Sequence, residues 1–150
     1  MRLLVVRHGE AEPLRMSDAE RRLTRAGRQQ VELLAARLQA AWAGRRLICS
    51  PYRRAQETAE ILAATLGGVP EIWDEITPEG SVRACAERLH DAQEDLVLVT
   101  HMHFLSDLCG YLVDGCLRSD DYALATASVR VLTAPLWLPG TARVMAGVDS

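Results

Sequence analysis

The segment Leu96–Thr100 (LVLVT) restricts the fold more than any other feature, because it is apolar on both faces of an extended chain. A strand without a polar face is typical of a parallel sheet that helices cover on both sides. Similar short aliphatic runs occupy residues 3–6 and 47–49. Such runs, separated by longer helical patterns, predict strands and helices that alternate along the chain.

Helical patterns fill the intervals between these runs. Thr24 is predicted to be the N-cap of a helix that ends near Gly44, and its apolar residues recur at helical spacing. A second helix is predicted to start at Ser50-Pro51, with Ser50 as the N-cap, and to end at Gly67. Two further helical patterns cover residues 81–93 and 105–113.

The order of these elements predicts an α/β fold, a three-layer α/β/α sandwich with a mostly parallel central sheet. Residues 128–134 and 142–146 indicate two late strands, antiparallel at an edge. With 150 residues, 49% hydrophobic and 25% charged, the chain fits a single domain spanning residues 1–150. Ligands of such sheets bind at the C-terminal ends of the strands.

Charge and composition exclude several functions. A formal net charge of −3 argues against nucleic acid as a partner. All 17 basic residues are Arg, and the chain contains neither Lys nor Asn. Schiff-base chemistry and a P-loop lysine are therefore excluded. Recognition of a phosphate must rely on Arg, His and backbone N–H groups.

The cysteines and the apolar runs bear on metals and location. The four cysteines, at 49, 85, 109 and 116, form no C-x-x-C pair and no zinc-ligand spacing, so we expect four small buried residues. The apolar run at residues 3–6 is too short for a signal peptide or a membrane span. We therefore expect a cytoplasmic protein without a membrane partner.

Three predicted strands lead into charged or potentially reactive side chains. The first strand runs into Arg7 and His8, the second leads through a Ser-Pro turn to Arg54, and the LVLVT strand runs into His101. Parallel strands would bring these ends together at one edge of the sheet. We therefore expect a pocket with two histidines and at least two arginines, with no obvious partner carboxylate.

Such a cluster suits phosphoryl chemistry. Guanidinium groups bind phosphate oxygens through two parallel hydrogen bonds. Nearby positive charge disfavours protonation of an imidazole, which leaves the ring neutral and nucleophilic at pH 7. A neutral imidazole can attack phosphorus and form a covalent phosphohistidine, while the arginines stabilise charge on the phosphoryl oxygens.

The motifs resemble those of a known family. Five segments occur in its order: RHGEAE (7–12), SDAERRLTRAG (17–27), LICSPYRRAQETAEIL (47–62), EITPEG (75–80) and LVTHMHFLSDL (98–108). Together they resemble the histidine phosphatase superfamily, which has the phosphoglycerate mutase-like fold. The resemblance is greatest to its small phosphohistidine phosphatases of the SixA type.

This resemblance implies specific roles. His8 would be the phosphorylated nucleophile, and Arg7 and Arg54 would clamp the phosphoryl group. His101 would be the second pocket histidine, donating to a phosphoryl oxygen. The motif spacing selects Arg54 rather than its neighbour Arg53, and one residue along a helix turns a side chain by about 100°. No metal and no cofactor are expected.

Other roles stay open in the sequence. The first candidate for the general acid is Glu75, and Asp74 is the alternative. A third alternative is that no dedicated acid exists, because the P–N bond of a phosphoramidate breaks without much help. His103 stands where small relatives often have Pro, and it lines the pocket mouth, contacts the substrate or is exposed on a loop. Asp18 belongs to a segment that we expect to order the active-site loop.

Chain length favours an uncapped pocket. Larger relatives carry insertions that cover the site, whereas residues 56–95 leave room here for one helix and a short strand. An open pocket favours a phosphorylated protein, such as a phosphohistidine-bearing domain, as the substrate. The alternatives are a small phosphorylated metabolite, a non-catalytic phosphate-binding module, and a metallohydrolase that uses His8, His101 and His103.

Overall fold

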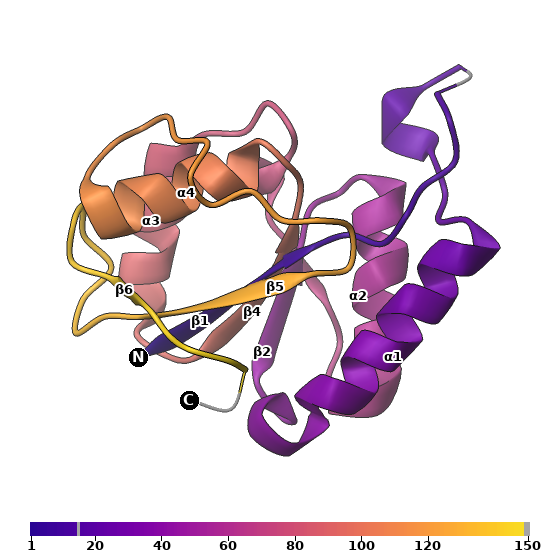
Figure 1. The fold of residues 1–150 in the computed structure, drawn as a ribbon, viewed down its shortest axis with the longest axis horizontal. Coiled ribbons are helices and arrows are strands. Elements are labelled where there is room, and N and C mark those ends of the chain that lie inside the picture. The colour runs from indigo at the N-terminus through magenta and orange to yellow at the C-terminus, as the bar shows by residue number, and fades with distance from the viewer. Residues whose placement is uncertain (15, 149–150) are drawn as a thin grey trace.

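The computed structural model describes residues 1–14 and 16–148, and a six-stranded sheet forms its centre (Figure 1). The strand order is β3-β2-β4-β1-β5-β6. The strands are β1 (Arg2–Arg7), β2 (Arg46–Cys49), β3 (Glu71–Ile72), β4 (Leu96–Thr100), β5 (Val129–Thr133) and β6 (Arg143–Val144). β4 pairs in parallel with both β1 and β2, which confirms the interior position predicted for the LVLVT run.

Helices cover both faces of this sheet. They are α1 (Arg25–Trp42), α2 (Arg53–Leu66), α3 (Val82–Ala92) and α4 (Phe104–Asp114), with short 3₁₀ turns η1 (Asp18–Glu20) and η2 (Asp74–Ile76). In Figure 1, α1 and α2 lie on one side of the sheet, and α3 and α4 lie on the other. The predicted three-layer α/β/α sandwich is therefore confirmed.

β4 connects the two hydrophobic cores. Val97 and Val99 point into the core under α1 and α2, whereas Leu96 and Leu98 point into the core under α3 and α4. All four side chains are buried. Burial of one such side chain contributes about 1.5–3 kcal/mol, so the alternation along one strand stabilises both layers at once.

The strand register brings the predicted site residues to one edge. Arg7 pairs with Thr100 and Cys49 pairs with Val99, so β1, β2 and β4 end at nearly the same level. The next residue in each strand keeps a ladder hydrogen bond: His8 N–H donates to Thr100 O (3.2 Å), and Ser50 N–H donates to Val99 O (3.1 Å). The expected convergence of the three strand ends is therefore present.

Of the two predicted helix N-caps, the structure confirms one and contradicts the other. Thr24 caps α1, and its side chain accepts a hydrogen bond from Gly27 N. The prediction of Ser50 as the N-cap of α2 is wrong, because the cap position is Tyr52 and the helix begins at Arg53. The Ser50 hydroxyl contacts the N–H of Tyr52 and the ring of His101 instead.

The late strands follow the prediction. β5 pairs antiparallel with β1, and β6 pairs antiparallel with β5 at the edge of the sheet. Cys49, Cys85 and Cys109 are buried as expected, but Cys116 is exposed. Within the described ranges, no helix has the length and apolar character needed to cross a membrane.

Candidate active site

His8 is a buried imidazole with a defined tautomer. Its Nδ1 lies 2.7 Å from Gly9 O, and since a carbonyl can only accept, Nδ1 carries the proton and Nε2 keeps its lone pair. Burial, reinforced by the charges of Arg54 and Arg7, lowers the pKa of His8 to about 4, although the Gly9 hydrogen bond opposes this. The ring is therefore neutral at pH 7.

Arg54 lies beside this lone pair. Its side chain is 5% exposed, and its Nε lies 3.3 Å from His8 Nε2. The rest of the guanidinium is held by Asp18, with Nη1 donating to the backbone oxygen (2.7 Å) and Nη2 to Oδ2 (3.3 Å). Arg53 is exposed and pairs with Glu57. The structure therefore places Arg54, and not Arg53, against the histidine.

Asp18 corrects the expectation that the cluster has no carboxylate partner. Its Oδ1 accepts from Arg21 Nη1 (2.9 Å), so the carboxylate bridges Arg21 and Arg54. Burial alone would raise the pKa of Asp18, but the hydrogen bonds and charges of the two arginines lower it below its usual range. Asp18 thus ties η1 to the first turn of α2, as expected for a residue that orders the loop.

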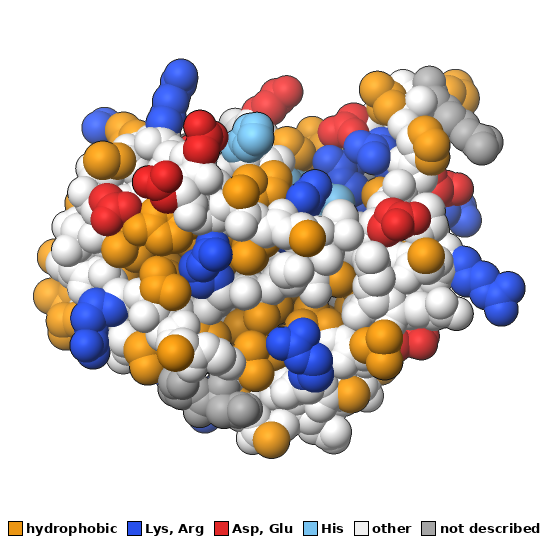
Figure 2. Space-filling model, in the orientation of Figure 1, with side chains coloured by type: hydrophobic (Ala, Val, Ile, Leu, Met, Phe, Trp, Pro, Cys, Tyr) orange, Lys and Arg blue, Asp and Glu red, His pale blue; other side chains and the backbone are white. Residues whose placement is uncertain are grey.

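Two nitrogens in the cluster are buried without a hydrogen-bond partner among the residues that the structure describes. Arg7 donates from Nη1 to Leu124 O (2.8 Å), but its Nε has no acceptor. His101 is 1% exposed, and its Nδ1 has no partner either. Figure 2 shows Arg and His side chains gathered in a notch at the upper edge of this face. Arg7 Nε and His101 Nδ1 are thus hydrogen-bonding groups that the described protein leaves unpaired.

His101 faces His8 across the cluster. The two ring centroids are 5.2 Å apart, and Tyr52 packs edge-on against His101 at the same centroid distance. Burial, followed by the charges of His8 and Arg54, lowers the pKa of His101 to about 2. Both histidines are therefore neutral at pH 7.

The loop that carries His8 is locked against α1 and α2. Gly9 N–H donates to Thr58 Oγ1 (3.1 Å), which itself donates to Arg54 O. A Cβ on Gly9 would lie 2.8 Å from Gly27 O, and a Cβ on Gly27 would lie 2.1 Å from Glu10 O. Both glycines are therefore required by close backbone approach.

The proposed acids make no hydrogen bond or ion pair with the cluster among the described residues, and Glu75 is bonded elsewhere. Glu75 accepts a hydrogen bond from Arg88 Nη1 of α3 (2.9 Å), which directs its carboxylate toward that helix. Asp74 is exposed. Among the contacts of the described residues, neither shares one with His8 or Arg54. The structure thus leaves the acid role of Glu75 as a prediction.

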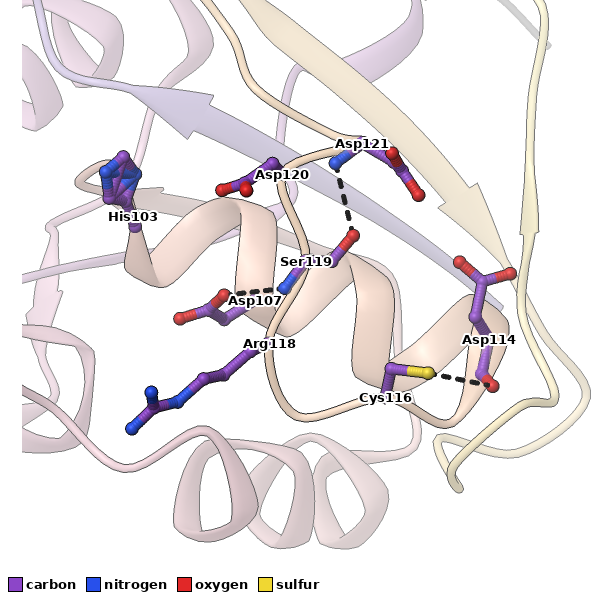
Figure 3. Close-up of a pocket in the computed structure, with 8 residues that line it drawn as sticks. All are labelled: His103, Asp107, Asp114, Cys116, Arg118, Ser119, Asp120 and Asp121. Atoms are coloured by element: carbon purple, nitrogen blue, oxygen red, sulfur yellow. Dashed lines mark hydrogen bonds between the residues drawn. The ribbon is translucent and has the colours of Figure 1, made fainter.

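His103 lines a different pocket, which is drawn in Figure 3. It stands exposed at the start of α4, and the pocket of about 770 Å³ continues past Asp107 and Arg118 toward the loop after α4. His101 and His103 both follow the end of β4, so they do not share a strand face as the metallohydrolase alternative supposes. No group of three His, Cys, Asp or Glu side chains in residues 1–14 and 16–148 is arranged to hold a metal ion.

Four contributors to the cluster have roles that the sequence reasoning did not predict. Thr58 follows Arg54 by four residues, so helical spacing alone places it on the same face. Asp18 was assigned to loop order without a partner, and Ser50 was assigned to a helix cap. The Leu124 carbonyl had no signal in the sequence, because its contact with Arg7 joins residues 117 positions apart.

Fold and cluster together define a phosphoryl-handling enzyme, and comparisons with known proteins agree. The sequence profile of the histidine phosphatase superfamily (branch 1) matches residues 3–77. A phosphohistidine phosphatase SixA homolog of Haemophilus influenzae is 30% identical over 131 residues, covering 75% of this chain and 77% of that protein. The chain therefore belongs to the histidine phosphatase superfamily and is a phosphatase.

Solved structures extend the likeness to the whole fold. The protein histidine phosphatase SixA in complex with tungstate superposes with a TM-score of 0.85 at 23% identity, covering 97% of this chain and 95% of that chain. The alpha-ribazole phosphatase of Shigella flexneri superposes with a TM-score of 0.78 at 19% identity, covering 100% and 96%. At these identities the likeness concerns the fold, and it confirms the phosphoglycerate mutase-like architecture.

Proposed function

We propose that this chain hydrolyses phosphohistidine on a protein, with His8 as nucleophile, Arg7 and Arg54 as the phosphoryl clamp, and His101 as a further donor. One observation carries the proposal. A neutral, buried imidazole presents its Nε2 lone pair to Arg54, and two neighbouring buried nitrogens, Arg7 Nε and His101 Nδ1, lack hydrogen-bond partners. That arrangement supplies a nucleophile and an anion site at the same point.

In the first step, the His8 Nε2 lone pair attacks phosphorus. A new P–N bond forms on His8, while the P–N bond of the substrate breaks and its electron pair stays on the departing imidazole. That ring leaves as a neutral group when its other nitrogen carries a proton, so no strong acid is needed. The Arg54 guanidinium, which contacts Nε2 in the free enzyme, turns its donors to the phosphoryl oxygens.

In the second step, water attacks phosphorus and the P–Nε2 bond breaks. The water oxygen stays on phosphate with one of its protons, so the product is hydrogen phosphate. The second water proton passes to solvent, the electron pair of the P–N bond returns to Nε2, and His8 is neutral again. The Gly9 carbonyl holds the proton on Nδ1 throughout, so the released nitrogen is again Nε2 with its lone pair. The cycle closes without a net change in the enzyme.

The chain topology supports a protein substrate. Between β3 and β4 the chain forms only η2 and α3, and α3 packs against the sheet beside α4. No inserted cap lies over the cluster in that described stretch. A phosphorylated side chain displayed on a domain surface can therefore approach, and the name of the Haemophilus influenzae relative points to the same substrate class.

The proposal is tested by phosphate release from a phosphohistidine-bearing protein domain, beside a panel of phosphate monoesters, for wild type and His8→Ala. We expect rapid release from the protein, slow ester turnover, and loss of both in His8→Ala. Brief reaction with radiolabelled substrate should also trap an acid-labile phosphoenzyme in wild type only. Faster turnover of one small ester would move the substrate to metabolism, and activity retained by His8→Ala would refute the nucleophile.

A further inference from the structure

Ser50 has two hydrogen-bond contacts, and their chemistry fixes its direction of donation. The residue is fully buried where β2 leads into α2. Its Oγ lies 3.2 Å from Tyr52 N and 2.8 Å from His101 Nε2. The Tyr52 N–H can only donate, so Oγ is its acceptor. Of the two contacts, only His101 Nε2 can accept the hydroxyl hydrogen.

This direction determines where the His101 ring carries its proton. Burial and the neighbouring charges keep the ring neutral, so only one of its nitrogens bears hydrogen. Since Nε2 accepts from Ser50, the proton is on Nδ1. That nitrogen is buried and has no acceptor among the described residues. The free enzyme thus holds an N–H without a partner, at a ring 5.2 Å from His8.

The opposite arrangement fits the surroundings less well. If Nε2 carried the proton and donated to Ser50, the Ser50 hydroxyl hydrogen would be buried without an acceptor. His101 Nδ1 would then present a lone pair inside the cluster and would repel a phosphoryl oxygen. Moving the His101 proton from Nδ1 to Nε2 would leave the buried Ser50 hydroxyl without an acceptor, and it would turn His101 Nδ1 from a donor into an acceptor.

We propose that Ser50 is a positioning residue that holds His101 in the Nδ1–H tautomer, which keeps this N–H ready to donate to a phosphoryl oxygen. The inference rests on the proposed function for the identity of the acceptor. The tautomer itself is a property of the free protein. Tyr52 contributes from the ring edge, because its packing restricts rotation of the imidazole.

The tautomer is measured directly by two-bond ¹H–¹⁵N correlation NMR of the ¹⁵N-labelled protein at pH 7, without substrate. The chain has four histidines, so His101→Gln assigns the signal. We expect wild-type His101 to be protonated at Nδ1. Ser50→Ala should shift the ring toward Nε2 protonation, whereas Ser50→Thr, which keeps a hydroxyl, should retain Nδ1 protonation.

The functional consequence is read from the affinity for tungstate, an oxyanion that stands in for phosphate. We expect Ser50→Ala to weaken tungstate binding about tenfold, the loss typical of one hydrogen bond to a charged group. Ser50→Thr should stay within about threefold of wild type. Ser106→Ala is the matched control, because Ser106 is equally buried and its hydroxyl donates to Ser119 O in the loop after α4.

Two results would overturn the inference: a wild-type His101 protonated at Nε2, or a Ser50→Ala protein whose His101 tautomer and tungstate affinity equal those of wild type. The wild-type measurement does not depend on Ser50→Ala, so a misfolded Ser50→Ala leaves the test intact. Failure of the proposed function is distinguishable. A protein with the expected tautomer and tungstate affinity that releases no phosphate from phosphohistidine would refute the substrate and not the role of Ser50.

Discussion

The buried cluster, which we call the floor, and the surface residues outside it, which we call the rim, are built in different ways. On the floor, His8, Arg54 and His101 are each less than a tenth exposed, and each is bonded to backbone or to a neighbouring side chain. On the rim, His103 is exposed and Glu75 is held by Arg88. The comparison teaches that the ends of paired strands hold the buried side chains in place, whereas the residues outside the cluster are exposed or bonded to other elements.

The largest effect should come from removing the nucleophile. We expect His8→Ala to lower turnover of a phosphohistidine substrate by about 10⁴-fold or more, since loss of a covalent nucleophile removes the main reaction path. Far-UV circular dichroism should show an unchanged fold. Turnover within tenfold of wild type would remove the distinction between floor and rim altogether.

A smaller effect is expected from the neighbouring arginines, which provide a matched pair. Arg54→Lys should lower kcat/KM by about 10²–10³-fold, because lysine cannot form the two parallel hydrogen bonds of a guanidinium. Arg53→Lys, at the exposed position next to it, should leave kcat/KM within about twofold of wild type. Steady-state kinetics on both proteins checks this, and equal losses would contradict the assignment of Arg54 to the floor.

The pH dependence of kcat/KM tests whether the His8 ring is as buried as the structure shows. In the proposed mechanism the neutral ring is the nucleophile, and its pKa is about 4, so kcat/KM should stay flat from pH 7 to about 5 and fall near pH 4. An acid-stable monoester is the suitable substrate, with its own ionisation corrected. An enzymatic pKa near 6.5 would show instead that water reaches the ring freely.

The same lowered pKa values predict acid sensitivity of the fold. Between about pH 6.5 and pH 4 the unfolded chain binds protons on His8 and His101 that the folded chain does not bind. The free energy of unfolding should therefore decrease as the pH falls through this window. Urea denaturation at several pH values measures it, and the His8→Ala protein should show a weaker decrease.

The rim should show the smallest change. Glu75→Gln is expected to lower turnover of phosphohistidine and of a phosphate ester by less than about threefold, because its carboxylate is engaged by Arg88 on a partly exposed surface. Glu79→Gln is the control in the same segment. A loss of about tenfold or more confined to the ester would instead establish Glu75 as the proton donor.

Much of the fold followed from local patterns in the sequence. The LVLVT run, the Thr24 cap and the helical spacing of apolar residues each depend on neighbours only a few positions away, and all three appear as predicted. Convergence of Arg7, His8, Arg54 and His101 also followed, because the rules of parallel sheets place successive strand ends at one edge.

Contacts between distant segments explain what was missed. Ser50 has the sequence context of a helix cap, yet its hydroxyl is used by a histidine 51 positions later. Asp18 reaches Arg54 across 36 positions, and Glu75 is diverted by Arg88, which lies on another element. The local sequence preferences of a residue depend only on its neighbours along the chain. Hydrogen-bond partners that are far apart in the sequence can therefore be identified only from the folded structure.

The contact between Gly9 and Gly27 has a consequence for engineering this protein toward other substrates. A side chain on Gly9 would clash with the Gly27 carbonyl, and a side chain on Gly27 would clash with the Glu10 carbonyl. A variant must therefore keep the segment that carries His8 and the start of α1 as a matched pair. Libraries that randomise residues 9 to 27 should consist mostly of inactive members. Diversity placed around His103 and the loop after α4 leaves that joint untouched, so it should yield new specificities on an intact catalytic floor.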